Sequence, residues 1–592
     1  MPPGTLVGVL LSKRQMEGVV IEQCGEPDFP THPAGAPSTL YYSPQQRKTA
    51  SFVSEYYGCS MGEALNLFVP FERNGTAAGA SAPSHAAIDV TLSAKQSEAL
   101  DFLRSHRVAL LFGDTGAGKS EIYMRRMDEI LSTRKRCLLL LPEIALTPQM
   151  EKRFAAHFGD AVVVWHSKMT PSQKKKALEK IRSGDARIVA GPRSALFLPI
   201  SELGLIVVDE EHDESYKSSS RPRYNARDIA VYVGTLLQIP VVLGSATPSL
   251  SSYARYPSFR LRGGYFNSHR RYVFEPSVEE LSGAIDAAVM ENFRAGHQGI
   301  VFLPTRANFK YLVCDGCGQS VECPFCSVGM SLHRNARALK CHYCNYTEPV
   351  PKVCPRCQSG HLTTSRLGTA EAVEHFSALS EELRVVQFDR DAITTQNKLV
   401  KALKAFNDRE IDLLVGTQML SKGHDYHDIS LAVVMGIDNL LAQADYRARE
   451  KALSLLVQIA GRSGRAGEAT VLVQSFNESF FRRYLGDYEL FLKEELKLRE
   501  RKYPPYKRLA RLLYAHKNGL KARGEMETAV QKLEMIATVE VMGWGASPIE
   551  KLSGKYRFQV LLRSDKSTDL IRAIKSVRSP LCEIDMDPVE FV

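Results

Sequence analysis

The stretch Gly113-Asp-Thr-Gly-Ala-Gly-Lys119-Ser120 lies between an apolar run, residues 109–112, and a segment with helical spacing, residues 121–131. It fits G-x-x-x-x-G-K-[ST], in which glycines let backbone N–H groups surround phosphate oxygens at the start of a helix. The strand–loop–helix order is the context that this motif requires. The stretch therefore predicts a nucleotide phosphate site in an α/β fold, and the alternative is a chance glycine loop.

The residue types in this loop predict separate roles. Lys119 is expected to reach the β- and γ-phosphates, and the hydroxyl of Ser120 is expected to hold Mg²⁺. The candidate ATP-binding residues of the loop are Gly113, Asp114, Thr115, Gly116, Ala117, Gly118, Lys119 and Ser120.

Short apolar runs alternate with helical segments on both sides of a cysteine-rich block. This alternation predicts parallel sheets and two α/β lobes, residues 91–263 and 264–485. Residues 1–70 have strand-like and helical runs of a small N-terminal module, and the Gly/Ala/Ser-rich residues 71–90 have the composition of a linker. Residues 486–592 combine helical charge patterning with alternating strand-like runs, which predicts an α+β C-terminal domain.

An apolar strand-like run, residues 205–208, ends in Asp209 and Glu210. An Asp at a strand end suits the Mg²⁺ of a phosphate-loop site, and a neighbouring Glu suits a residue that polarises the attacking water. A solvated acidic loop is the alternative for such a motif alone. Together with the glycine loop, the pair predicts ATP hydrolysis, with Asp209 on the metal and Glu210 on the water.

Two further motifs suit an ATPase with two lobes. Arg462 and Arg465 lie three residues apart among glycines after a helical run, and arginines so placed can stabilise phosphoryl charge. A basic surface turn is the alternative. Gly244-Ser-Ala-Thr-Pro-Ser249 ends another strand of the first lobe, where it could couple the nucleotide to lobe motion; an ordinary turn is its alternative.

The chain has 12 cysteines, and eight of them fall within residues 314–357 as four CxxC pairs. Two such pairs complete a tetrahedron of thiolates, so eight cysteines suit two Zn²⁺ ions with closed, structural coordination. The spacing groups Cys323, Cys326, Cys341 and Cys344, and leaves Cys314, Cys317, Cys354 and Cys357 for the second ion. Iron–sulfur clusters and reduced thiols are the alternatives.

Aromatic and cationic residues alternate just after the acidic motif, in residues 214–227. Tyrosine rings can stack on bases while lysine and arginine meet phosphates. The candidate DNA-binding residues are Tyr216, Lys217, Arg221, Arg223, Tyr224 and Arg227. A merely solvated loop is the alternative.

Taken together, these motifs resemble those of superfamily 2 helicases. The DEEH acidic motif, GSATPS, the run from Gly416 to Asp425, LPEIALT (141–147), GPRSAL (191–196), DYRARE (445–450) and the eight cysteines are more specifically similar to the primosomal replication-restart (PriA) family. The resemblance covers residues 90–592 and implies RecA-like lobes with a zinc-binding insertion at 313–358. It also implies 3′→5′ unwinding of DNA forks driven by ATP, and the same nested cysteine pairing. By the same resemblance Gln96 would recognise adenine, although an exposed helix glutamine is the alternative.

The two ends of the chain resemble the family unequally. Residues 1–70 resemble a domain that captures a nascent 3′ end, but in shortened form, and the family's winged-helix module has no counterpart in residues 71–90. The C-terminal domain is similar at residues 503–506 and 556–560. Partners implied by the resemblance are forked and single-stranded DNA, the single-stranded-DNA-binding protein, and primosome or helicase-loader proteins.

Composition limits the remaining possibilities. The 592 residues are 44% hydrophobic and 24% charged, which is the balance of a folded globular chain. The net charge of +10 permits a polyanionic partner. No run approaches the roughly 20 apolar residues of a membrane span, so we expect a soluble, cytoplasmic protein without a membrane partner. A double-strand DNA translocase and a non-catalytic fork-binding scaffold remain the alternative functions.

Overall fold

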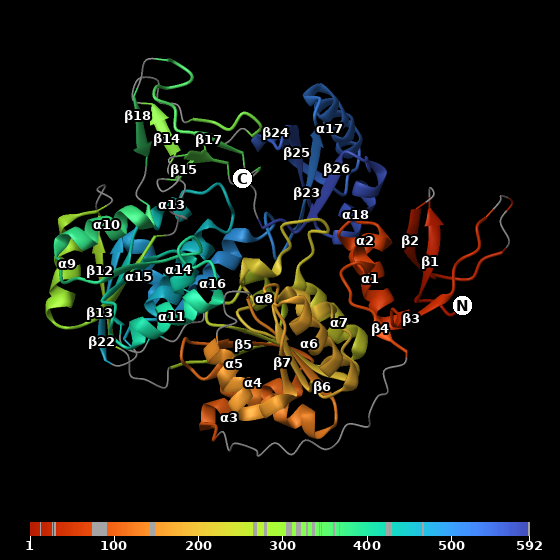
Figure 1. Ribbon diagram of the computed structural model, residues 1–592, viewed down its shortest axis with the longest axis horizontal. Coiled ribbons are helices and arrows are strands. Elements are labelled where there is room, and N and C mark those ends of the chain that lie inside the picture. The colour runs from red at the N-terminus through yellow and green to blue at the C-terminus, as the bar shows by residue number, and fades with distance from the viewer. Residues whose placement is uncertain are drawn as a thin grey trace. The chain divides into compact units, whose positions relative to one another are not determined.

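The computed structural model describes most of the chain (Figure 1). The described residues are 1–11, 14–25, 28, 31–73, 91–142, 148–263, 269–276, 281–303, 311–314, 321–326, 330–333, 338–341, 344, 346–358, 361–365, 368–421, 426, 429–464 and 467–589. They divide into two compact units, residues 1–248 with 255–262, and residues 249–254 with 263–592. The predicted lobe boundary near residue 263 is close to this division, but residues 249–254 join the second unit.

A seven-stranded sheet forms the centre of the first unit, and every pairing in it is parallel. In spatial order its strands are β11 (Ser258–Leu261), β5 (Val108–Gly113), β10 (Val241–Ser245), β9 (Leu203–Val208), β6 (Arg136–Leu140), β8 (Ile188–Gly191) and β7 (Val162–Val164). The central strands are buried along almost their whole length, as expected for a sheet covered by helices on both faces.

Helices cover the faces of this sheet, and short 3-10 segments connect them. They are α3 (Ala94–Ser105), α4 (Lys119–Ser132), α5 (Pro148–Phe158), α6 (Pro171–Ser183), α7 (Ala226–Leu237), and the 3-10 turns Gly159–Ala161, Arg193–Phe197 and Glu214–Tyr216. The start of α3 is fixed by a capping box, in which Ser93 and Gln96 exchange side-chain and backbone hydrogen bonds.

The N-terminal module of the first unit is a small antiparallel sheet with two helices. Its strands run β2 (Arg14–Val19), β1 (Thr5–Leu11), β3 (Pro37–Tyr41) and β4 (Phe71–Glu72), and its helices are α1 (Pro44–Tyr56) and α2 (Met61–Leu65). The ring of Phe52 on α1 stacks on Tyr232 of α7, with centroids 4.0 Å apart. The predicted linker, residues 71–90, falls mostly on residues 74–90, which lie outside the described residues.

The second unit has a six-stranded sheet in which every pairing is also parallel. Its strands are β12 (His269–Glu275), β22 (Glu468–Gln474), β21 (Ile429–Val434), β13 (Gln298–Phe302), β20 (Leu413–Gly416) and β19 (Val385–Phe388). Its helices are α8 (Leu250–Arg255), of which residues 250–254 fall in this unit, α9 (Gly283–Arg294), α10 (Thr369–Leu379), α11 (Gln396–Asn407), α12 (Gln418–Ser421), α13 (Asp438–Leu441), α14 (Ala448–Ala460), α15 (Glu478–Leu485) and α16 (Tyr488–Arg499). The two parallel sheets confirm the predicted pair of α/β lobes.

The cysteine block forms an antiparallel sheet inserted after β13. Its strands are β17 (Thr347–Pro349), β16 (Ala338–Lys340), β15 (Ser331–His333), β14 (Tyr311–Cys314) and β18 (Leu362–Ser365). The first and last of these in the chain, β14 and β18, pair directly with each other. Entry and exit of the insertion therefore lie side by side, so the block leaves the parallel order of the lobe unchanged.

The C-terminal domain has an antiparallel sheet of β24 (Glu540–Leu552), β25 (Lys555–Ser564), β23 (Arg508–His516) and β26 (Cys582–Met586), with helices α17 (Gly519–Glu534) and α18 (Ser567–Ser576). This confirms the predicted α+β tail. Among the described residues, every helix is too short or too polar to cross a bilayer.

Candidate nucleotide site and metal centre

The phosphate loop begins where β5 ends at Gly113 and stops where α4 begins at Lys119. Gly116 and Gly118 have φ of +78° and +81°, a conformation that L side chains rarely adopt. A Cβ on Gly118 would also lie 2.1 Å from Nε2 of Gln96. Glycine is thus required at both positions, and the loop has the form that the sequence pattern predicts.

Two side chains contact the backbone of this loop. Lys119 Nζ donates to the carbonyl oxygens of Gly113 and Asp114, at 2.9 and 3.4 Å. Gln96 Nε2 donates to the carbonyl oxygen of Ala117 at 3.2 Å. Lys119 therefore lies over the loop that precedes it, and Gln96 lies beside the loop rather than on a remote helix face.

Parallel pairing brings the acidic motif to the same edge of the sheet. Strand β10 pairs with both β5 and β9. Gly113 and Ser245 are the last residues of β5 and β10, and Asp209 directly follows β9, so all three lie at the carboxyl ends of adjacent strands. Ligand sites in parallel α/β sheets form at this edge. The structure thus places the two predicted halves of the nucleotide site next to each other.

The carboxylate of Asp209 is partly buried among groups of mixed charge. Tyr123 on α4 donates its hydroxyl to Asp209 Oδ1 at 3.0 Å. Burial and the neighbouring Glu210 raise the pKa of Asp209 to about 6, while Lys119 and the Tyr123 hydroxyl act in the opposite direction. Two adjacent carboxylates at the end of a buried strand fit a divalent cation, which would offset their repulsion.

Glu210 has an unusual backbone and an available oxygen. Its φ is +46°, which costs a residue other than glycine about 1–2 kcal/mol. Its Oε2 is buried and accepts no hydrogen bond from the described residues, although His212 Nδ1 lies 3.6 Å away. His212 Nδ1 is instead 2.7 Å from Ser245 Oγ, at the end of β10. A strained acid with a buried unsatisfied oxygen is the arrangement expected of a functional residue.

The loop after the acidic motif differs from its predicted role. Tyr216 is 1% exposed and donates its hydroxyl to the backbone oxygen of Asp209 at 2.7 Å. Tyr224 is 6% exposed and packs edge-on against Phe197. Neither ring offers a face to a base in this structure, so the burial does not support base stacking. The Tyr216 hydroxyl instead connects this loop to the acidic motif.

The cations of the same loop lie in two environments. Lys217 is buried, with its Nζ 5.6 Å from the ring centroid of Tyr57, and Arg227 pairs with Glu211 at 3.1 Å inside the unit. Arg221 is exposed at the surface, where it pairs with Glu63. Arg223 is partly exposed. Only the last two are placed where a phosphate could reach them directly.

The arginine motif lies in the second unit. Arg462 follows α14 and its backbone N–H donates to Ile459 at 2.9 Å, which continues the helical turn. Arg465 and the residues 422–425 of the Gly416–Asp425 run lie outside the described residues, as does much of the LPEIALT motif. The sequence indicated the two arginines but no role for Ser463 between them. Ser463 is fully buried, and its carbonyl oxygen accepts a hydrogen bond from Arg270 on β12.

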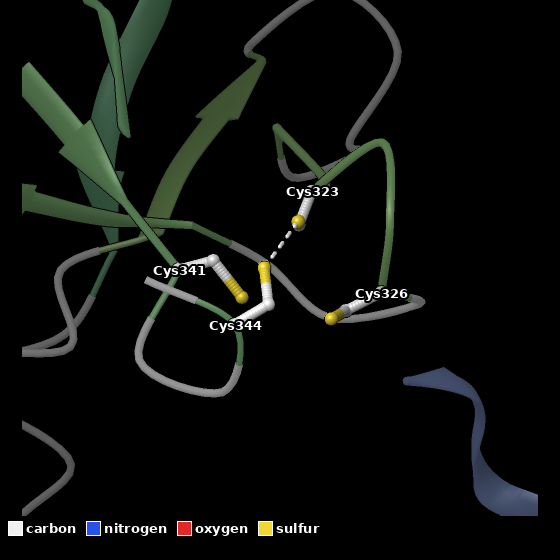
Figure 2. Close-up of side chains that lie close together, drawn as sticks. All are labelled: Cys323, Cys326, Cys341 and Cys344. Atoms are coloured by element: carbon white, nitrogen blue, oxygen red, sulfur yellow. Dashed lines mark hydrogen bonds between the residues drawn. The ribbon is translucent and has the colours of Figure 1, made fainter. Parts of the chain in front are cut away.

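The inner cysteine group lies together as the spacing predicts (Figure 2). The sulfur atoms of Cys323, Cys326, Cys341 and Cys344 lie within 4.8 Å of one another. The sulfur atoms of Cys323 and Cys344 are 3.6 Å apart, close to the roughly 3.8 Å edge of a tetrahedron with 2.3 Å zinc–sulfur bonds. A disulfide would require about 2.0 Å. The donor set therefore fits one tetrahedral ion.

The sulfur atoms of the outer cysteine group also lie close together. The sulfur atoms of Cys314, Cys354 and Cys357 lie within 4.8 Å of one another, and those of Cys314 and Cys357 are 3.5 Å apart. Cys317 lies outside the described residues. Three of the four predicted ligands are thus brought together, and the fourth is not described.

Comparison with known proteins gives the class of the chain. The DEAD/DEAH box helicase family matches residues 93–256, and the helicase conserved C-terminal domain family matches residues 357–467. These matches cover the phosphate loop, the acidic motif and the arginine motif. With the two parallel α/β lobes, they define a helicase with an ATP-dependent core.

Two further matches narrow the class. The PriA DNA helicase Cys-rich region domain matches residues 323–349, and the primosomal protein N C-terminal domain matches residues 499–589. The replication restart protein PriA of Helicobacter pylori is 43% identical over 99% of this chain and 96% of its own length. The PriA of Bacillus subtilis is 35% identical over 82% of this chain and 64% of its own length. The chain belongs to the PriA family of replication restart proteins.

Among solved structures, that of Mss116p bound to single-stranded RNA and AMP-PNP aligns with 75% of this chain. The alignment includes 80% of the Mss116p chain, at 13% sequence identity and a TM-score of 0.44.

Proposed function

We propose that the chain is an ATP-dependent 3′→5′ DNA helicase that recognises stalled or abandoned replication forks and D-loops and initiates primosome assembly for replication restart. The observation that best supports this function is the phosphate loop beside a buried acidic strand end, in a chain of the PriA family. ATP with Mg²⁺ supplies the energy of the reaction. The proposed place of action is the cytoplasm, where such DNA substrates occur.

The residues of the first unit have the following proposed roles. Lys119 leaves its loop carbonyls to bind the β- and γ-phosphates, and Ser120 and Asp209 hold Mg²⁺. Glu210 orients the attacking water. Its Oε2 is buried and accepts no hydrogen bond from the described residues, so it is suited to accept one from that water. Gln96 recognises adenine, since its amide lies beside the loop at Ala117.

In the second unit, Arg462 and Arg465 stabilise the charge that develops on the transferred phosphoryl group. Arginine suits this role because its guanidinium stays charged and presents several donors in one plane. Nucleotide-dependent closing of the lobes then moves single-stranded DNA along the chain. Arg221 and Arg223 contact its phosphates, and Tyr216 reports DNA binding to Asp209 through its hydroxyl.

We further propose that the cysteine block holds two Zn²⁺ ions with structural roles. The inner four thiolates complete one tetrahedron, and Cys317 completes the outer one with Cys314, Cys354 and Cys357. Proposed partners besides forked and single-stranded DNA are the single-stranded-DNA-binding protein and a primosome or helicase-loader protein.

The deciding experiment measures ATP hydrolysis on three DNAs: single strand, duplex, and a fork with a leading-strand 3′ end at its junction. Strand separation is followed on partial duplexes with either a 3′ or a 5′ single-stranded tail. Lys119→Ala should abolish hydrolysis while fork binding stays measurable, and Lys152→Ala, at an exposed lysine of the same unit, is the matched control.

The outcomes separate the candidate functions. Stimulation by single strand and fork, with unwinding only from a 3′ tail, is the expected result. Stimulation by duplex alone would indicate a double-strand translocase. Tight fork binding without hydrolysis on any DNA would indicate a scaffold, and full turnover by Lys119→Ala would refute the assignment of the phosphate site.

A further inference from the structure

A hairpin of the C-terminal domain reaches the inner cysteine group. Strands β24 and β25 pair up to Leu552 and Lys555, and Ser553 and Gly554 form the turn between them. The φ angles of these two residues are +48° and +76°, as in the tight hairpin turns whose twist matches that of the strands. The turn is thus a compact tip with its backbone N–H groups directed away from its own sheet.

Both N–H groups of this tip donate to the segment that holds two of the cysteines. The N–H of Ser553 donates to Sγ of Cys326 at 3.1 Å, and the N–H of Gly554 donates to the carbonyl oxygen of Phe325 at 2.8 Å. Figure 2 shows the blue C-terminal segment beside Cys326, at the edge of the cysteine group. The donor and acceptor of the first bond are 227 residues apart.

Side chains of the hairpin add to these backbone contacts. Lys551 Nζ donates to the carbonyl oxygen of Pro324 at 3.2 Å. Leu552 packs against the buried core of the block, which includes Val321, Met330 and Leu339. The contact therefore combines apolar burial with directional bonds to three successive residues of the block, 324–326.

Hydrogen bonds to a ligand atom orient it and tune the metal that it binds. An N–H that donates to a thiolate is a charge-assisted bond, and it is stronger than the same bond to a neutral thiol. Cys326 is deprotonated when it binds a metal cation. The hydrogen bond from the N–H of Ser553 is stronger to this thiolate than to the thiol, so it favours the state of the block in which Cys326 binds the metal. The zinc ion in turn fixes the segment that accepts both N–H groups.

We propose that the tip of the β24–β25 hairpin is an outer-sphere partner of the inner zinc site, so that zinc binding and docking of the C-terminal domain on the cysteine block stabilise each other. This inference rests on the proposed zinc site. By linkage, the factor by which docking strengthens zinc binding equals the factor by which zinc binding strengthens docking.

The first test measures zinc affinity and release by competition with a chromogenic chelator in the full-length protein. The double variant Lys551→Ala with Leu552→Ala removes the side-chain contacts of the tip without adding charge. One of the two zinc ions should be released about tenfold faster and bind about tenfold more weakly, at the lower end of effects seen for such partners. Lys555→Ala, at the exposed end of the same turn, is the matched control and should behave like the unchanged protein.

The second test keeps the sequence unchanged and removes the metal. Amide hydrogen exchange at residues 551–555 should be slow with zinc and at least tenfold faster after chelation. The pairing of β23 with β26, on the other side of the C-terminal sheet, should stay protected. Equal protection of the tip with and without zinc, or equal zinc release by the double variant and the control, would overturn the inference.

These results are separable from failure of the zinc site itself. Metal analysis of the purified protein shows whether zinc is present before either test. A protein that holds no zinc would refute both the site and the inference, whereas zinc held equally tightly by all variants would refute only the inference.

Discussion

Replacement of Arg499 by Met should strongly destabilise the second unit. Arg499 on α16 is 4% exposed and pairs with Glu450 of α14 at 2.7 Å and with Glu495 at 3.2 Å. Its guanidinium also lies 4.9 Å from the ring centroid of Tyr446. Burial lowers the pKa of Arg499, but the two carboxylates more than offset this, and the pKa ends above its ordinary value.

The magnitude follows from what the substitution leaves behind. Glu450 and Glu495 are 12% and 4% exposed, so two carboxylates would remain in a poorly solvated site without this cation. Removal of one partner from a buried ion pair costs about 3–5 kcal/mol. At about 2 °C per kcal/mol for a unit of this size, the unfolding transition of the second unit should fall by about 6–10 °C.

A matched control lies on the same helix. Lys493 pairs with Glu489 at 3.0 Å, but its side chain is 60% exposed. An exposed helical pair of this spacing contributes only about 0.3–0.5 kcal/mol, so Lys493→Ala should move the transition by less than about 1 °C. Differential scanning calorimetry of the full chain measures both variants under the same conditions.

A second arm tests the cause. When Glu450→Gln and Glu495→Gln are added to Arg499→Met, the site holds no buried carboxylate without a cation. Arg449 also loses its partner Glu495, but its side chain is 38% exposed, so most of the lost stability should return. If Arg499→Met costs no more than Lys493→Ala, or if the triple variant is no more stable than the single one, the reasoning from buried charge is refuted.

Three further predictions concern the nucleotide site and the zinc ions. Gly244→Ala should cost about 1–3 kcal/mol and lower ATP turnover, because the added Cβ would lie 1.6 Å from the Tyr123 hydroxyl and displace it from Asp209; urea unfolding and ATPase assays check this. Arg227→Met should cost about 3–5 kcal/mol because it removes the cation that pairs with Glu211, which is 1% exposed, and thermal unfolding of the first unit checks it. Chelation of zinc should reduce strand separation but preserve DNA-stimulated ATP hydrolysis, because the block is a separate sheet; loss of both activities together would contradict this.

The lobes could be predicted from the sequence because their central strands are buried on both faces. Such strands are apolar at nearly every position, as residues 205–208 are. The edge strands β11 and β12 gave no such signal, because SFRL (258–261) and HRRYVFE (269–275) contain polar and charged residues and are mostly only partly buried. Parallel pairing, not local sequence, places them in their sheets.

The site was predictable where chemistry fixes residue types at fixed spacing, as in the phosphate loop and the CxxC pairs. Contacts between residues that are far apart in the sequence could not be predicted. Tyr123 reads as an ordinary helical residue, and its bond to Asp209 joins positions 86 residues apart. Tyr216 has the residue type of a stacking platform, but its ring is 1% exposed and its hydroxyl donates to the backbone oxygen of Asp209.

The GSATPS motif, residues 244–249, lies between two contacts that the sequence alone does not indicate. Ser245 ends β10 beside His212, and its Oγ accepts from the N–H of Thr247. Three residues after Thr247 the chain is already in the second unit, where the N–H of Leu250 donates to Glu450 at 3.0 Å. Only Pro248 and Ser249 lie between Thr247 and Leu250 along the chain.

Glu450 lies on α14, the helix that leads into Arg462. Its other carboxylate oxygen is held by Arg499, so α8, α14 and α16 are joined through one side chain. The hydrogen bond from Leu250 to Glu450 therefore connects the segment after GSATPS to the helix that leads into Arg462. The Arg499 variant therefore also tests a function of this contact: if α14 takes part in coupling, a loosened Glu450 should lower strand separation more than ATP hydrolysis when both are measured on the same DNA.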